Sequence, residues 1–132
     1  MTHHVCRGFR FAALLPFALI LTTATTLAQT TGAMYINANK LTNNEVWSYA
    51  RAADGTLTFV GAYATQGGGT GNADLRSQGA IAATKDGKFI FAVNANTNDI
   101  TAFAAQPNGQ LTFVGRFPSG GTFPNSLTVF GN

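Results

Sequence analysis

The sequence predicts an all-β fold, a partial β-propeller with about two four-stranded antiparallel blades and one strand of a third. Three observations predict it: a long internal repeat, short apolar segments separated by turn residues, and a low content of charge. Charged residues make up 10% of the chain and hydrophobic residues 45%, with 15 glycines and 11 phenylalanines. This composition is too apolar for a disordered chain, and it favours short strands joined by turns over helices.

The N-terminus has the layout of a secretory signal peptide. Arg7 and Arg10 form a basic region, residues 11–21 form an apolar run, and small residues then lead to Ala28 before Gln29. The apolar run is shorter than the roughly 20 residues that span a bilayer, which argues against a membrane anchor. We therefore expect cleavage after Ala28, export to the periplasm or the extracellular space, and no membrane attachment of the mature chain.

The predicted mature chain, residues 29–132, contains neither histidine nor cysteine, because His3, His4 and Cys6 lie in the leader, residues 1–28. A Ser-His-Asp triad, a cysteine nucleophile, a Cys/His zinc site and disulfides are therefore excluded within it. Six basic residues stand against five acidic ones after cleavage, a net charge of +1, so nothing favours nucleic-acid binding. We predict no cofactor and no metal site.

An internal repeat with an offset of 54 residues is the strongest signal for the fold. Residues 44–49 match residues 98–103, and residues 54–61 match residues 108–115 without a gap. The segment Leu-Thr-Phe-Val-Gly is identical in both copies. A period of this size, with several strands in each unit, is typical of a β-propeller. Past short gaps, the alignment continues with residues 36–39 on 93–96 and residues 68–70 on 120–122.

The better-preserved copy predicts one complete blade, residues 79–117. Its four strands are expected at residues 80–84, 89–94, 100–104 and 111–115. Turns rich in glycine, asparagine and proline separate them, and these residues supply the backbone angles that tight turns need. Four strands joined by three turns form one propeller blade.

The other copies are incomplete. The first blade, residues 33–63, begins at residues 34–37 with what corresponds to a second strand, so its innermost strand is missing. Residues 125–131 begin a third blade, with residues 126–130 as its innermost strand. An unclosed propeller leaves strand edges and apolar faces exposed, so we expect the chain to associate with itself.

Several segments of the second blade resemble a known family. Residues 77–81, 85–95 and 98–100 are similar to the lactonase-family propellers, which include 6-phosphogluconolactonase-like and carboxymuconate-cyclase-like proteins. Propellers of the YVTN type share this strand-turn pattern. Residues 118–124 resemble the linker into that family's next blade, and the resemblance covers nearly all of residues 32–132. It implies that the chain is an N-terminal fragment, since propellers have about 4 to 8 blades.

The resemblance implies that the parent protein hydrolyses a sugar-acid or related lactone and that the fragment itself is inactive. Its ligand would then be a small lactone or sugar acid. The alternative is a non-catalytic exported propeller used for binding or scaffolding, because propellers support many functions. Whether the chain is an enzyme therefore stays open. No position matches a family catalytic motif well enough to be assigned a role, so the catalytic residues stay unidentified.

Four polar residues precede the innermost strand of the second blade and are the candidate ligand-binding residues: Asp74, Arg76, Ser77 and Gln78. This position lies near the mouth of a propeller channel, where loops meet ligands. Arg76 can hold a carboxylate or phosphate through its planar guanidinium. The alternative is a solvated loop with one weak salt bridge.

Three other features have structural interpretations. Residues 67–71 lack the Lys-Ser/Thr and the helix of a phosphate-binding loop, which favours a linker between blades. Trp47 is expected to pack between blades rather than to stack on a ligand. Recurring asparagines favour turns over calcium binding, because no Asp-x-Asp-x-Asp-Gly loop is present. They are Asn37, Asn39, Asn43, Asn44, Asn94, Asn96 and Asn98.

Overall fold

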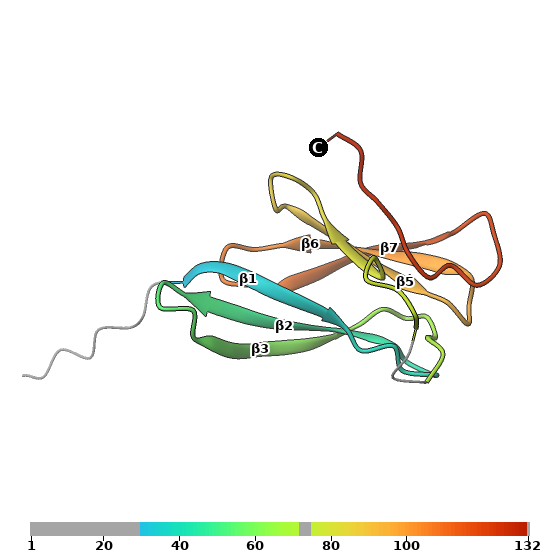
Figure 1. Cartoon of the computed structure of the whole chain (residues 1–132), viewed down its shortest axis with the longest axis horizontal. Helices are drawn as coiled ribbons and strands as arrows, with labels where there is room; N and C mark the ends of the chain where they lie inside the picture. The colour runs from blue at the N-terminus through green and yellow to red at the C-terminus, as the bar shows by residue number, and fades with distance from the viewer. Residues whose placement is uncertain (1–29, 72–74, 132) are drawn as a thin grey trace, which may run out of the picture.

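The computed structural model describes residues 30–71 and 75–131, which form seven β-strands in two antiparallel sheets (Figure 1). The described residues contain no helix, and so none that is long and apolar enough to cross a membrane. The all-β partial propeller is thereby confirmed. The predicted signal peptide, residues 1–28, lies outside the described residues.

Each sheet is an antiparallel meander in which consecutive strands are neighbours. The first sheet consists of β1 (Thr30–Asn37), β2 (Glu45–Ala52) and β3 (Leu57–Ala64). The second consists of β4 (Ile81–Ala83), β5 (Phe89–Asn94), β6 (Asp99–Ala105) and β7 (Leu111–Pro118). Among the described residues, the first sheet has no counterpart of β4, which is the innermost strand of the second sheet.

The two sheets repeat the same local irregularity. The pairing of β2 with β3 shifts just before Tyr49, where β3 has Val60 as an extra residue, and the pairing of β6 with β7 shifts in the same way just before Phe103, where β7 has Val114. Each of these rings then packs edge-to-face on a ring of the next strand, Tyr49 on Phe59 at 5.4 Å and Phe103 on Phe113 at 6.1 Å between centroids. Both rings of the second pair lie 54 residues after their counterparts. The offset of the repeat is therefore confirmed in three dimensions over these strands.

A hydrogen-bond motif also recurs where the chain leaves each sheet. The Thr65 N–H donates to the Asn44 carbonyl at 2.8 Å, and the Thr65 Oγ1 lies 2.9 Å from the same oxygen and shares its one proton between this carbonyl and the Asn94 Oδ1. The Ser119 N–H likewise donates to the Asn98 carbonyl at 3.0 Å, and the Ser119 Oγ lies 2.9 Å from that oxygen. In both sheets, the hydroxyl residue that follows the last strand therefore makes the same contact with the asparagine that precedes the neighbouring strand.

Upstream of β2 and β6, the sequence alignment is wrong by one residue. Val46 pairs with Asn37, whereas its counterpart Ile100 pairs with Val93. Asn37 therefore corresponds to Val93 and not to Asn94. A shift of one residue moves a side chain to the other face of a sheet. Because the alignment matched Asn37 with Asn94, it placed Asn37 on the wrong face.

Residues 126–130 do not form the predicted innermost strand of a third blade. No strand is assigned within residues 119–131, and this C-terminal segment crosses the second sheet on the side away from the first (Figure 1). The Leu127 N–H donates to the Gly79 carbonyl at 2.9 Å. A strand needs a ladder of such bonds to a neighbour, and the described residues provide no second strand of a third blade for it.

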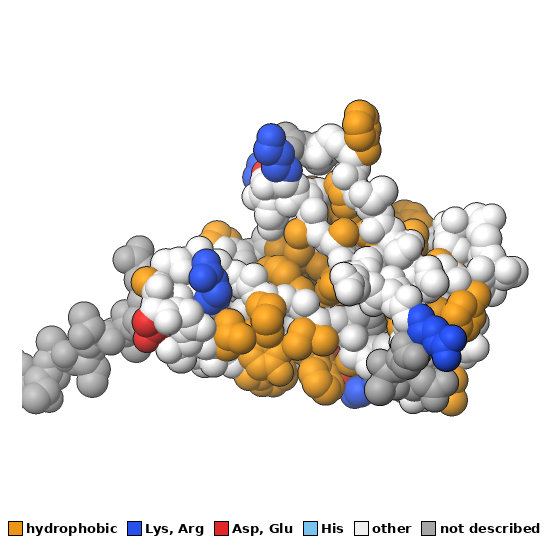
Figure 2. All heavy atoms as spheres, in the orientation of Figure 1, with side chains coloured by type: hydrophobic (Ala, Val, Ile, Leu, Met, Phe, Trp, Pro, Cys, Tyr) orange, Lys and Arg blue, Asp and Glu red, His pale blue; other side chains and the backbone are white. Residues whose placement is uncertain are grey.

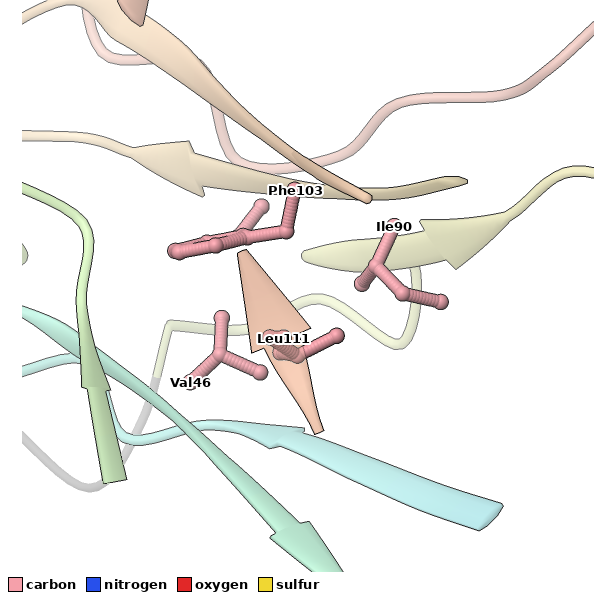
Figure 3. Packing of buried hydrophobic residues seen from close by; sticks show 5 residues of the cluster. Val46, Ile90, Phe103 and Leu111 are labelled. Atoms are coloured by element: carbon pink, nitrogen blue, oxygen red, sulfur yellow. The ribbon is translucent and has the colours of Figure 1, made fainter. Parts of the chain in front are cut away.

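The hydrophobic core lies between the two sheets (Figure 3). Val46 of β2 packs against Ile90, Phe103 and Leu111 of the second sheet, and all four are at most 6% exposed. Because neighbouring residues of a strand point to opposite faces, each sheet has a second face that this core does not use.

Candidate functional site

The candidate site is an open pocket of about 410 Å³ between the end of β1 and the segment that leads into β4. Two asparagines line it from the first sheet, and residues 75–78 and Ala80 line it from the second. The structure thus brings Arg76, Ser77 and Gln78 together at one pocket. Asp74 lies outside the described residues.

Asn37 connects the two sides of this pocket. Its Nδ2 donates to the Ala80 and Val93 carbonyls, at 3.2 and 2.9 Å. Its Oδ1 accepts the Asn39 N–H and the Asn44 Nδ2, both at 3.0 Å. Two donors and two acceptor positions exhaust the capacity of an amide. Asn37 therefore holds the pocket wall in place, and its side-chain amide has no donor or acceptor left for a ligand.

The segment before β4 has an unusual backbone. Arg76 adopts the left-handed region at φ 52°, which is uncommon for a residue other than glycine. The Ser77 Oγ accepts the Gly79 N–H at 3.1 Å and so closes a turn directly behind Arg76. Arg76 and Gln78 are exposed at the rim. Such strained positions are frequent where a protein contacts a ligand.

The described lining of the pocket offers several hydrogen-bonding groups. Besides the Asn37 amide, whose hydrogen bonds are all made within the chain, the described lining has one guanidinium, one hydroxyl and two further amides. Among the residues with described positions, no group of three His, Cys, Asp or Glu side chains could hold a metal ion. A guanidinium can bind an anion, and hydroxyl and amide groups can hydrogen-bond to a molecule rich in hydroxyl groups.

A buried polar network behind the pocket was missed by sequence reasoning. The Asn94 Oδ1 accepts the Asn44 Nδ2 and the Thr65 Oγ1, at 2.9 and 2.8 Å. The Asn94 Nδ2 donates to the Asp99 Oδ1 and the Thr101 Oγ1, at 2.6 and 2.9 Å. These residues are at most 6% exposed. The network joins the two sheets and, through Asn44, holds Asn37 at the pocket.

The turn interpretation therefore holds for only some of the asparagines. Asn39, Asn43 and Asn98 have left-handed backbones with φ between 51° and 57°, as turns require. Asn44 and Asn94 are fully buried hydrogen-bonding residues instead. Nothing in the local sequence distinguishes these two asparagines from those in turns.

The glycine-rich segment between β3 and β4 is a linker, as predicted, and it is closely packed. The Gly68 N–H donates to the Thr97 Oγ1, and the Gly68 carbonyl accepts the Asn96 N–H, both at 3.0 Å. Gly67 lies against Asn94, and Gly69 lies against the side chain and backbone of Asn39. The linker therefore fills the space between the polar network and the pocket wall.

Trp47 does not lie between the two described sheets. Val46 and Ser48, its neighbours in β2, face the second sheet, so Trp47 points away from it. Its Nε1 donates to the Glu45 Oε2 at 2.9 Å, and the Lys40 Nζ lies 2.7 Å from the same oxygen. The bond from Lys40, followed by that from Trp47, lowers the pKa of Glu45 below its usual value.

Comparisons with known proteins agree with the architecture. The family model described as "Lactonase, 7-bladed beta-propeller" matches residues 42–130. A Bacteroides fragilis protein described as a 6-phosphogluconolactonase is 25% identical over 71% of this chain, with a TM-score of 0.56. A protein from Lactobacillus plantarum has the same fold, with 19% identity over 79% of this chain and a TM-score of 0.51.

The present chain spans only part of these structures, 24% of the first and 30% of the second. No curated protein matches the sequence significantly. The family model, however, covers well over half of the chain, including both sheets except for β1. The chain therefore belongs to the lactonase family of seven-bladed β-propellers.

Proposed function

We propose that this chain is part of an exported lactonase-like propeller and that its pocket before β4 binds a sugar acid or the corresponding lactone. The observation that carries the proposal is the placement of Arg76, Ser77 and Gln78 around one pocket with Asn39. A guanidinium suits a carboxylate or a lactone carbonyl, and amides and hydroxyls suit sugar hydroxyl groups. The description of the Bacteroides protein as a 6-phosphogluconolactonase supports this class of ligand.

The binding part of the proposal is tested by titrating isotope-labelled residues 29–132 with gluconate and recording backbone amide NMR spectra. We expect shifts concentrated at Ser77, Gln78 and Ala80. Arg76→Gln should weaken binding about tenfold, because it removes one charge-assisted hydrogen bond to the carboxylate. Arg51→Gln, at an exposed arginine of β2 that does not line the pocket, is the matched control and should leave the affinity unchanged.

Glucose provides the second control, because it has similar hydroxyl groups and no carboxylate. Equal binding of glucose and gluconate, or an unchanged affinity after Arg76→Gln, would contradict recognition of the acid by Arg76. If neither gluconate nor its lactone binds to the chain, the result would favour the alternative, a non-catalytic exported propeller used for binding or scaffolding.

We propose that these residues bind the ligand without hydrolysing it. Lactone hydrolysis needs a group that activates water, and such general bases are usually carboxylates or histidines. The described lining of the pocket contains neither. A pH-stat assay with glucono-δ-lactone should therefore give the uncatalysed rate for residues 29–132. A faster rate would overturn the proposed inactivity and would at the same time support lactonase activity.

Export is the remaining part of the proposal, and the leader makes a specific prediction. Expression of the whole chain in a bacterial host should yield a secreted or periplasmic product that begins at Gln29, measured by intact mass. Ala28→Arg should block this cleavage, since the processing site needs a small residue. A product that keeps residues 1–28 in the cytoplasm would show that the leader does not direct export.

A further inference from the structure

We propose that two copies of this chain associate head to tail, so that the second sheet of one copy is covered by the first sheet of the next. Two surfaces take part. The outer face of the first sheet is the side away from the second sheet and consists of Met34, Ile36, Trp47, Tyr49, Leu57 and Phe59. The open face of the second sheet is the side away from the first sheet and consists of Phe89, Phe91, Ile100, Val114 and Phe117. The inference does not depend on the proposed ligand.

The packing of the first sheet on the second indicates which kind of surface fits each of the two faces. Leu111, which faces the first sheet, is 6% exposed, whereas Leu57, its counterpart 54 residues earlier, is 43% exposed on the outer face. Val46, which faces the second sheet, is 0% exposed, whereas its counterpart Ile100 is only half-buried on the open face. Each side of the internal interface therefore has a second version elsewhere in the chain that no other described sheet covers.

These second versions of the interface carry matching side chains. On the outer face, Tyr49 and Phe59 form the same edge-to-face pair that Phe103 and Phe113 form in the second sheet. Figure 2 shows hydrophobic side chains gathered over β1, β2 and β3. The open face corresponds to the side of the first sheet that contacts the second, and the outer face corresponds to the side of the second sheet that contacts the first. The open face of one copy can therefore pack against the outer face of the next. Contact between two different surfaces of identical chains is a heterologous interface, which forms rings or open chains.

Residues 126–130 give an independent reason to choose a second copy as the partner. Within the described part of the chain, the first sheet ends at β1, whose outer edge pairs with no described strand. Leu127 and Val129 lie beside Phe91 and Ile100 at a pocket of about 230 Å³ on the open face. A first sheet docked on this face brings its β1 to the place where residues 126–130 of the other copy supply a strand at this edge. Strand addition of this kind satisfies backbone groups along the edge.

The contact between copies lacks the polar network of the internal interface. Asn94 and Thr101 correspond to Ala38 and Trp47 in the first sheet, by the strand pairing and by the 54-residue offset. No amide is therefore available at that position to bridge to Asn98 and Ser119. We expect the association to be weaker than a typical permanent interface, with a Kd on the order of 10 μM.

Complementation between two variants tests the head-to-tail arrangement. Leu57→Asp places a charge on the outer face, and Phe117→Asp places one on the open face; both residues are exposed, so the fold should persist. Analytical ultracentrifugation of residues 29–132, which contain all described strands, should show association of the unchanged chain. Each variant alone should associate at least about tenfold more weakly, because a buried unpaired charge is costly. An equimolar mixture should form a dimer through the remaining intact pair of faces.

Leu41→Asp is the matched control, because Leu41 is 54% exposed and lies in the β1–β2 loop, outside both faces. It should associate like the unchanged chain. A monomer at every soluble concentration, a variant that associates as strongly alone as the unchanged chain, or a mixture without dimers would each overturn the proposal. Hydrogen exchange supplies a second readout, since amides of residues 126–130 should exchange more slowly in the mixture. Unchanged exchange there would remove the donated strand from the proposal.

Discussion

Replacing Asn94 with alanine is expected to lower the free energy of unfolding by about 4 kcal/mol, because several buried polar groups lose their partner at once. The Asn94 amide bonds to Asn44 and Thr65 of the first sheet and to Asp99 and Thr101 of its own sheet. Removing it leaves both sides of the interface with unsatisfied atoms. Urea unfolding followed by tryptophan fluorescence should show a lower midpoint.

Asn96→Ala is the control for this prediction. Asn96 lies two residues further along the same turn, and its side chain is exposed. We expect a change within about 0.5 kcal/mol, as for most surface substitutions. A similar loss of stability for both variants would mean that the turn, rather than the buried network, determines how the sheets are joined.

Replacing Gly69 with alanine is expected to cost about 3 kcal/mol, the upper part of the range for an overpacked site. A Cβ at this position would lie 2.4 Å from the Asn39 Oδ1 and 2.6 Å from its carbonyl carbon. Backbone atoms cannot yield as the end of a flexible side chain can, so the linker or the β1–β2 loop must move. Because Asn39 lines the ligand pocket, the variant should also weaken gluconate binding if the proposed site is correct.

The repeat supplies a matched control in Gly121→Ala. Gly121 aligns with Gly69 in the sequence, yet a Cβ there would meet nothing within 4 Å. The same chemical change should therefore leave the urea midpoint nearly unaltered. Equal destabilisation by the two substitutions would rule out close packing of the linker as the cause.

Much of the fold could be predicted because its signals are local or periodic. The 54-residue offset and the glycine turns follow from side chains and spacing within short segments. The face of the sheet on which Asn37 lies could not be predicted. The alignment matched two asparagines by residue type and ignored the alternation of side chains along a strand. The expected strand at residues 126–130 also failed, because a strand depends on a partner that the described residues do not include.

The candidate site shows the same division. Position before an inner strand was enough to select Arg76, Ser77 and Gln78, and the structure places all three at one pocket. The role of Asn94 was not predictable, because its four partners come from both sheets and are separated by up to 50 residues along the sequence. Only tertiary packing brings such groups together. The sequence alone does not distinguish an asparagine that is buried from one that lies in a turn.

The exit contact shared by Thr65 and Ser119 has a consequence for how such chains lengthen. Each unit finishes with a hydroxyl residue whose backbone N–H donates to the carbonyl of an asparagine in the same unit, and this bond needs no group from the unit that follows. Stability in an array of this kind accumulates by nearest-neighbour terms, as in other repeat proteins. Duplication of a single gene segment can therefore add a unit to the array without redesign of those already present.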